Sequence, residues 1–381
     1  MVFNGWRDTL ADNLTTVFKW QDPNIISDAP ALAVLPSGRL LCSVNLWSRD
    51  DTAQRVYGTQ RCFVFASDDD GSTWQEVSRT SFATGKFLVR GDKVYYIGAG
   101  MDWEGLWVTS SSDGGQTWNF PTQIHEDKVY ACSTGWVIRG QFLYWAADNM
   151  QPANRRVFAI AADLEADLET PGAWRMSPSI THPGVPQVLG AEQHNGGVWL
   201  EPNVIHHEQK LLLVVRVRIT RNDCNQILQV LPNVAAVCNL DDNDTQMNLA
   251  FSHFHPMPGA QNHFHILFDD ITNLHWMTCN HVTGVATDCW HGWANERRVL
   301  MLQYSLDGLN WFPAGCMAMG SKVTTAFNYC TPVIDTDDLL IVARTARHAP
   351  NQHDNDCVTF HRIPNFRSNA MNLVQRKDAN D

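Results

Sequence analysis

The sequence predicts an all-β fold, and three observations carry this prediction. A turn motif of the form Ser-x-Asp-x-Gly-x-Thr-Trp occurs at 67–74 and again at 111–118, and a shorter third copy lies at 305–311. Apolar runs of strand length, separated by turns, recur in units of roughly 60 residues. Helical periodicity is nearly absent. These patterns predict a six-bladed β-propeller of four-stranded antiparallel blades, in a single domain over residues 1–381.

The turn motif has a clear physical basis. Its Ser and Asp side chains can accept hydrogen bonds from nearby backbone N–H groups, as in Asx and Ser/Thr turns. Gly115 of the second copy would take a positive φ, which costs glycine little. Trp118 would fold back over the turn as an apolar plug. The motif therefore predicts tight outer turns and says little about chemistry.

The strands follow in order along the chain. Residues 1–29 form a lead-in, and a strand at 15–20 would supply the fourth strand of the last unit and close the ring. The first two strands of the six units are predicted at 31–35 and 40–46, 86–89 and 93–97, 131–138 and 141–146, 199–205 and 210–217, 263–268 and 274–279, and 329–334 and 339–343. The third strands are predicted at 61–66, 106–110, 157–161, 227–237, 299–304 and 357–363. A β-sandwich is the alternative, but sandwiches do not repeat a turn motif at blade spacing.

The composition of the chain excludes some classes of binding partner. The net charge of −12 argues against nucleic acid and against an anionic membrane surface. No apolar run approaches the ~20 residues of a membrane span. The first residues lack a charged segment followed by an apolar one, which predicts a cytoplasmic protein, or a secreted or periplasmic one whose leader is not part of this chain. The oligomeric state is left open.

The ten cysteines show no C-x-x-C pair and no zinc spacing. Most lie in apolar runs and are expected to be buried. Cys224 with Cys238, and Cys279 with Cys289, flank loops and are candidates for disulfides in an exported protein. The sequence predicts no cofactor.

The chemistry of a propeller is expected at one mouth of the central channel, where the first two strands of each unit begin and end. Glu201 opens one strand of unit four and Arg216 ends its neighbour, so the two lie at one end of a hairpin. Tyr329 opens a strand of unit six and Arg344 closes the next one. These four side chains are therefore predicted to converge.

Other candidates lie close to these strand ends. Trp199, His353 and Asp354 are expected to contact substrate beside them, and Asp28 precedes the first strand of unit one. Arg218 competes with Arg216 for the arginine position. An ion pair at a hairpin mouth and a tyrosine packed in the channel wall remain the structural alternatives.

The turn motif resembles the Asp-box of the sialidase-like β-propellers. Thr359-Phe360-His361-Arg362 and Asn365-Phe366-Arg367 also resemble the end of the last blade in uncharacterised bacterial proteins called sialidase-like. The resemblance covers most of the chain. It implies that Glu201 is the base that activates Tyr329 as nucleophile, while Arg216 and Arg344 bind the carboxylate of the substrate.

The sequence departs from that family in two places. Ser27-Asp28-Ala29-Pro30 stands where sialidases carry an arginine, and a histidine-rich segment at 253–265 stands in unit five where another arginine is expected. These departures predict an incomplete arginine clamp, with fewer charge-assisted contacts to a carboxylate.

Unit five carries histidines in the segment where the arginine is expected. His263 and His265 lie two residues apart on one strand, and side chains alternate along a strand, so both face the same way. A zinc site lacks a third ligand with clear spacing, and general acid/base work suits an imidazole better. The sequence therefore predicts no metal. Related propellers include uronate lyases that use such a His and Tyr.

Three functions follow. The first is a sialidase-like glycoside hydrolase acting on an acidic or decorated glycan, with Glu201 as base for Tyr329 or paired with Asp28 or Asp354 as a second carboxylate. The second is a uronate polysaccharide lyase using His263 or His265 with Tyr329. The third is a non-catalytic glycan-binding propeller. All three predict an acidic oligosaccharide or polysaccharide as partner.

Overall fold

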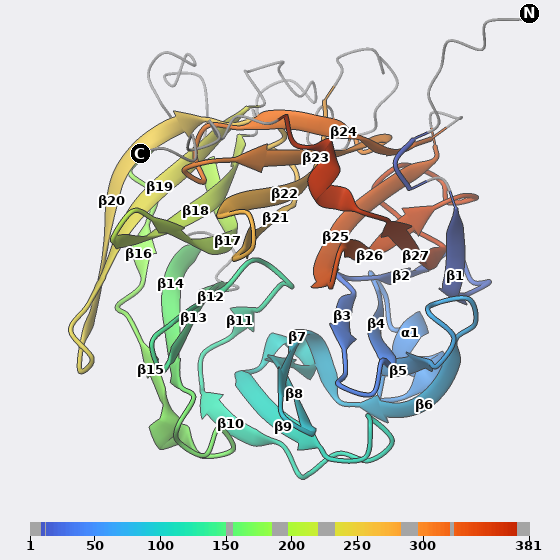
Figure 1. The fold of residues 1–381 in the computed structure, drawn as a ribbon. Helices are drawn as coiled ribbons and strands as arrows, with labels where there is room; N and C mark the ends of the chain where they lie inside the picture. The colour runs from blue at the N-terminus through green and yellow to red at the C-terminus, as the bar shows by residue number, and fades with distance from the viewer. Residues whose placement is uncertain are drawn as a thin grey trace, which may run out of the picture.

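The computed structural model describes residues 9–11, 13–149, 155–184, 197–219, 233–282, 296–320 and 324–371. Nearly all of the regular structure is β, and the strands form six antiparallel sheets arranged as blades in a ring (Figure 1). The prediction of a six-bladed β-propeller is confirmed.

The blades follow the chain order. Blade one contains β3 (Ala31–Val34), β4 (Leu40–Ser48), β5 (Cys62–Ser67) and β6 (Gln75–Thr80), and blade two contains β7 (Phe82–Arg90), β8 (Lys93–Gly100), β9 (Leu106–Ser111) and β10 (Thr122–His125). Blade three contains β11 (Val129–Tyr130), β12 (Val137–Arg139), β13 (Phe142–Asn149), β14 (Arg156–Asp163), β15 (Trp174–Met176) and β16 (Ile180–Thr181). Blade four contains β17 (Gly197–His207), β18 (Lys210–Ile219), β19 (Val234–Asp242) and β20 (Met247–Pro256). Blade five contains β21 (Phe264–Asp269), β22 (Leu274–Asn280), β23 (Val299–Ser305) and β24 (Phe312–Met319).

Blade six joins the two ends of the described chain. It contains β25 (Ala326–Asp335), β26 (Asp338–Ala346) and β27 (Cys357–Ile363), and its fourth strand is β1 (Leu14–Lys19), which pairs with β27. Figure 1 shows the blue β1 beside the red β27. The pairing gives β27 a hydrogen-bonded neighbour on its outer side, and it closes the ring by joining the start of the chain to its last blade.

One extra strand, β2 (Ile25–Ser27), pairs with β4 in blade one. The connections contain the short helix α1 (Thr52–Tyr57) and the 3₁₀ turns η1 (Met101–Trp103), η2 (Pro171–Ala173) and η6 (Phe366–Asn369). The strand predicted at 131–138 is wrong, because the two short strands β11 and β12 replace it and both pair with β13. Part of the strand predicted at 227–237 lies outside the described residues, and β19 begins only at Val234.

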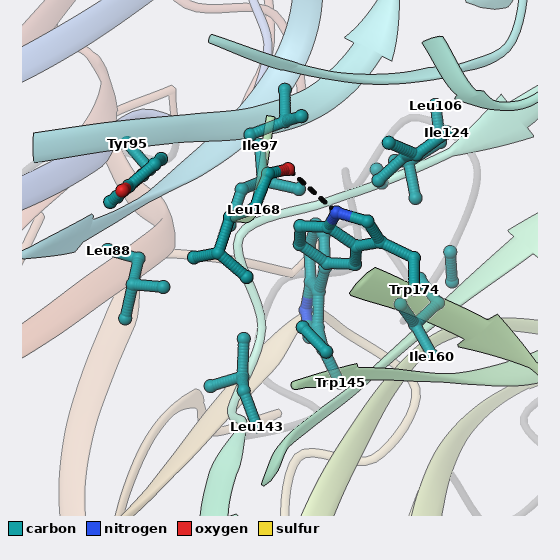
Figure 2. Packing of buried hydrophobic residues seen from close by; sticks show 14 of the residues in the cluster. Leu88, Tyr95, Ile97, Leu106, Ile124, Leu143, Trp145, Ile160, Leu168 and Trp174 are labelled. Atoms are coloured by element: carbon teal, nitrogen blue, oxygen red, sulfur yellow. Dashed lines mark hydrogen bonds between the residues drawn. The ribbon is translucent and has the colours of Figure 1, made fainter. Parts of the chain in front are cut away.

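Apolar side chains from adjacent blades form the core. One cluster lies between each pair of neighbouring blades, so the ring is held by six separate contacts rather than by one central core. Figure 2 shows the cluster between blades two and three, where Trp145 and Trp174 pack among aliphatic side chains. The indole N–H of Trp174 donates to the carbonyl of Leu168 at 2.9 Å, so this large side chain is buried without an unsatisfied donor.

The repeated turn motif has the predicted geometry. In the first copy, Ser67 Oγ accepts from the N–H of Gly71 at 2.9 Å, and Asp69 Oδ1 accepts from the N–H of Thr73 at 2.8 Å. Gly71 has a φ of 84°, and a Cβ there would lie 2.2 Å from the ring of Phe360 in blade six. The turn of blade one therefore packs tightly against Phe360 of the neighbouring blade six. It follows the end of β5, whose last residue pairs with the first residue of β4, so it lies at the ring face opposite the end of β4.

Candidate active site

Two matching irregularities place the central residues of the site. The pairing of β17 with β18 shifts between Leu200 and Asn203, and the pairing of β25 with β26 shifts between Asn328 and Thr331. Glu201 and Tyr329 lie in these two bulges with φ values of 53° and 51°. A non-glycine residue in the left-handed region stores strain, and such residues cluster at functional sites. The bulges of blades four and six thus present one side chain each at the same end of an inner strand.

The predicted convergence of Glu201, Tyr329 and Arg216 is present in the structure. The Tyr329 hydroxyl donates to Glu201 Oε1 at 2.8 Å, and Arg216 Nη1 donates to Glu201 Oε2 at 2.6 Å. Arg216 Nη1 also lies 3.4 Å from the Tyr329 oxygen. All three residues are at least nine-tenths buried. A carboxylate within hydrogen-bond reach of a phenol has the geometry of a base beside a nucleophile.

Two more arginines lie over the tyrosine ring. The guanidinium carbon of Arg344 is 4.9 Å from the centre of the Tyr329 ring, and that of Arg297 is 5.1 Å away. Arg297, just before β23, was not among the candidates from the sequence, and it brings a further arginine to this ring from blade five. Three guanidinium groups and the carboxylate of Glu201 therefore lie around the tyrosine.

The electrostatics keep Glu201 ionised and Tyr329 protonated. Burial alone would raise the pKa of Glu201, but Arg216 and the surrounding donors outweigh it and hold that pKa at about 2. Burial and the Glu201 charge raise the pKa of Tyr329, although the three arginines oppose them. Burial lowers the pKa of Arg297 to about 10, helped by its two arginine neighbours. The phenol therefore holds a proton that the neighbouring carboxylate can accept.

His263 also packs on the tyrosine ring. Its ring stacks on Tyr329 with centroids 4.7 Å apart, and burial lowers its pKa to about 4, so the imidazole is neutral near pH 7. His265 lies elsewhere in the channel. Its Nδ1 is 3.0 Å from the carbonyl oxygen of Ser133 and its Nε2 is 3.2 Å from Lys86 Nζ, so it links blades two, three and five. Of the two predicted histidines, only His263 touches Tyr329.

Asp28 lies at the channel mouth and is held by a tyrosine of blade three. Its Oδ1 accepts from the Tyr130 hydroxyl at 2.7 Å and from the N–H of Ala29 at 2.8 Å. Burial raises the pKa of Asp28, and the charge of Arg344 and the Tyr130 hydroxyl partly offset this rise. Asp28 is therefore tied to blade three rather than to Glu201 or Tyr329.

His353 and Asp354 form a layer behind Arg344. Arg344 Nη2 donates to the carbonyl of His353 at 2.6 Å, and His353 Nδ1 is 3.0 Å from Asp354 Oδ1. Asp354 also accepts two hydrogen bonds from Arg49, at 2.6 and 3.1 Å. These contacts hold Arg344 and join blades one and six, and the expected contact of His353 and Asp354 with substrate stays a prediction.

Trp199 is a core residue in this structure. Its side chain is fully buried in the cluster between blades three and four, where its ring lies 5.5 Å from that of Phe251. The expectation that it stacks on substrate is corrected by this burial. The side chain of Arg218, and the residues Cys224 and Cys289, lie outside the described part of the chain.

Asp148 was missed by the sequence reasoning. It lies near the end of β13, and its Oδ2 accepts from the N–H of Glu201 at 3.0 Å. Asp148 could have been predicted from the expectation that site residues lie at the ends of the first two strands of a unit, because β13 is the second strand predicted in unit three. Arg297 was harder to predict, since it precedes the third strand of its blade, and the expectation concerns only the first two strands.

A cavity of about 210 Å³ lies beside this centre. Its lining includes Trp47 at the end of β4, Asp51 before α1, and Trp103 in η1. Trp103 packs on Tyr130 with ring centroids 5.1 Å apart, and Tyr130 holds Asp28, so the cavity adjoins the channel mouth.

The described residues contain neither a cluster suited to a metal ion nor a helix suited to a membrane. No group of three or more His, Cys, Asp or Glu is arranged there to hold a metal ion. Within those same ranges, no helix has the length and apolar character needed to cross a membrane.

Comparison with known proteins shows the fold. No protein-family model matches the sequence, and no curated protein sequence matches it. The α-L-arabinanase of Penicillium chrysogenum complexed with arabinobiose matches with a TM-score of 0.55 at 11% identity, over 93% of this chain and 98% of that chain. The GH93 α-L-arabinofuranosidase of Fusarium graminearum with arabinobiose matches with a TM-score of 0.56 at 11% identity, over 93% and 98%. The Trypanosoma rangeli sialidase in complex with sialic acid matches with a TM-score of 0.52 at 13% identity, over 95% of this chain and 59% of that chain. At these identities the chain shares the propeller fold of these proteins.

Proposed function

We propose that this protein is a sialidase-like glycoside hydrolase that cleaves the glycosidic bond of an acidic sugar. The observation that carries the proposal is the contact of 2.8 Å between Tyr329 and Glu201, with Arg216 bonded to the same carboxylate. The solved structures of similar fold support a carbohydrate substrate, since their ligands are arabinobiose and sialic acid.

The charge of the site favours an acidic sugar. Arg216, Arg297 and Arg344 surround Tyr329 and are each about 2% exposed. An anionic ligand stabilises a cluster of buried guanidinium groups, and a planar carboxylate accepts bidentate hydrogen bonds from arginine. A sugar carboxylate beside the reacting carbon would also repel a carboxylate nucleophile, whereas a neutral phenol can approach it.

The first step breaks the glycosidic bond. The Tyr329 oxygen attacks the anomeric carbon while its proton passes to Glu201, which the geometry places within hydrogen-bond reach. The bond from that carbon to the leaving oxygen breaks, and the leaving oxygen takes a proton from a general acid. In the second step water attacks the same carbon and the bond from that carbon to the Tyr329 oxygen breaks. The acid residue recovers a proton from this water, and Glu201 returns its proton to the Tyr329 oxygen.

Asp51 is the candidate general acid. Three aspartates line the cavity beside the centre, namely Asp50, Asp51 and Asp102. Asp50 accepts the backbone N–H of Thr52 and Asp102 lies 3.6 Å from Arg61, so both carboxylates are engaged within the protein. Asp51 begins α1 and lies at the cavity wall, where a leaving group would emerge.

A uronate lyase is the second candidate, and one observation favours it. His263 is neutral and stacks on Tyr329, so a base and a phenol lie together beside three arginines. In that reaction one group removes the proton at C5 of a uronate, the other protonates the leaving oxygen, and a C4=C5 double bond forms.

One experiment separates these functions. The protein is incubated with sialosides, uronate polymers and arabinobiose, and reducing-sugar release is measured together with absorbance near ~235 nm, where an unsaturated uronate absorbs. Reducing sugar from an acidic substrate without new absorbance supports the hydrolase. New absorbance establishes the lyase instead. Hydrolysis of arabinobiose alone overturns the acidic substrate, and binding without turnover on every compound leaves a glycan-binding propeller.

A further inference from the structure

The backbone of Glu201 is held from a neighbouring blade. The shift in pairing between β17 and β18 falls at Glu201 and Pro202, so neither residue is paired across the two strands. Glu201 is buried, and a buried N–H without an acceptor costs free energy comparable to a lost hydrogen bond. The acceptor is Asp148 Oδ2 of blade three, at 3.0 Å.

Asp148 is itself fixed by an ion pair. Its other oxygen lies 3.2 Å from Arg155 Nη1. The guanidinium of Arg155 also lies over the ring of Tyr130, 5.5 Å from its centre, and Tyr130 donates to Asp28. One end of the Asp148 carboxylate is thus anchored in blade three while the other end reaches across to blade four.

The hydrogen bond from the Glu201 N–H to Asp148 helps to hold the strained backbone of Glu201 in place. A φ of 53° is unfavourable for glutamate, and such a conformation persists only where its surroundings fix it. A carboxylate that accepts the Glu201 N–H fixes the peptide plane and thereby the direction of the side chain. That direction brings Glu201 Oε1 to 2.8 Å from the Tyr329 hydroxyl.

We propose that Asp148, anchored by Arg155, is a positioning residue that holds the general base Glu201 in reach of Tyr329. The role of Glu201 as base rests on the proposed function. Asp148 itself is not expected to contact substrate, because its two oxygens face the Glu201 N–H and the Arg155 guanidinium. Its removal should therefore change the rate of the chemical step and leave substrate binding nearly unchanged.

Two variants of Asp148 test the proposal. Asp148→Asn keeps an oxygen that can accept the Glu201 N–H, and Asp148→Ala removes it. A misplacement of about 1 Å in a catalytic group can cost roughly 100-fold in rate. We expect kcat to fall on the order of 100-fold in Asp148→Ala with KM within about 3-fold, and to recover to within about 5-fold of the native value in Asp148→Asn.

Asp269→Asn is the matched control. Asp269 is also a buried aspartate, and it accepts two hydrogen bonds from Arg367, at 2.8 and 2.9 Å. It is the last residue of β21 and lies six residues after His263, at the other end of that strand. Its loss should lower stability without changing kcat, which separates a general structural effect from positioning.

Crystal structures of the two Asp148 variants make the test independent of the substrate. We expect the Glu201 carboxylate to leave Tyr329 in Asp148→Ala and to keep its contact in Asp148→Asn. A native contact in Asp148→Ala, with native kcat, overturns the positioning role. If the native protein hydrolyses none of the substrates, the proposed function fails, while the Glu201–Tyr329 distance in the variants still decides whether Asp148 positions Glu201.

Discussion

Tyr329 donates a hydrogen bond of 2.8 Å to Glu201, and both residues have left-handed backbones in bulges of two blades that are not neighbours. Their contact is made across the channel, where inner strands of all blades approach one another. Each bulge adds a residue to one strand and turns its side chain away from the regular alternation. The same device, used twice, aims the two side chains at one point.

Tyr329→Phe should abolish hydrolysis while leaving the fold intact. The change removes the attacking oxygen and one hydrogen bond to Glu201, which keeps its bond to Arg216. Loss of a nucleophile typically costs roughly 10³-fold or more in kcat. Steady-state kinetics and thermal unfolding of the variant check both expectations.

Tyr96→Phe is the control for this change. Tyr96 is also fully buried, and its hydroxyl bonds to Ser43 at 3.2 Å, away from the centre. It should keep native kcat. If Tyr329→Phe retains more than about a tenth of native kcat, Tyr329 is not the nucleophile.

Arg297→Gln should weaken binding of the acidic group. A hydrogen bond to a charged group contributes about 1.5–3 kcal/mol, so KM for an acidic substrate is expected to rise roughly 10- to 150-fold. The methyl ester of the same substrate carries no charge and should bind native and variant proteins more nearly alike. Arg175→Gln, which removes a pair with Asp242 at the outer part of blades three and four, is the control. Equal losses for acid and ester would contradict a carboxylate partner for Arg297.

Asp51→Ala should show a dependence on the leaving group. If Asp51 protonates the leaving oxygen, glycosides with a natural sugar alcohol lose on the order of 10²–10⁴-fold in kcat/KM. Aryl glycosides with an acidic phenol leave without that proton and should lose far less in the first step. Asp50→Ala serves as control, because its carboxylate is engaged by Thr52. Equal losses for both classes of substrate would remove Asp51 from the acid role.

Asp148 should make stability depend on pH in an unusual direction. Burial raises its pKa from 3.8 to about 7, although Arg155 and the Glu201 N–H oppose the rise. Between these values the folded protein binds a proton that the unfolded chain releases, so the contribution of Asp148 to stability falls as pH rises from about 4 to about 7. The melting temperature of the native protein, relative to Asp148→Asn, should therefore decrease over this interval.

Asp269→Asn gives the opposite control. The pKa of Asp269 is lowered in the fold, because the hydrogen bonds and charge of Arg367 outweigh burial. Its stabilisation is present above 3.8 and is lost only as pH falls below that value. The melting difference for this pair should stay flat from about pH 5 to 8. A flat difference for Asp148→Asn as well would show that Asp148 is ionised throughout.

The sequence predicts those site residues whose positions follow from the pattern of strands and turns along the chain. The hairpin carrying Glu201 and Arg216, and the one carrying Tyr329 and Arg344, were found because each pair lies at one end of two adjacent strands. Arg297 was missed because it reaches the centre from a connection rather than from an inner strand. The roles of Asp354 and Trp199 depend on which neighbours use their polar atoms or cover their rings. Such contacts between blades leave no periodic signal along the chain.

Gly135→Ala should destabilise the protein strongly, because three blades meet at this glycine. Its N–H donates to Asn203 Oδ1 at 2.7 Å, and an added Cβ would lie 2.0 Å from the carbonyl oxygen of Ile266. Neither backbone can move away without breaking the contacts of the same Asn203 amide with both blades three and five. Overpacking typically costs about 1–3 kcal/mol, and a clash with backbone should reach the upper end. Gly172→Ala, where an added Cβ meets nothing within 4 Å, is the control and should unfold at the native temperature. If both variants melt like the native protein, the channel wall at Gly135 is looser than this packing requires.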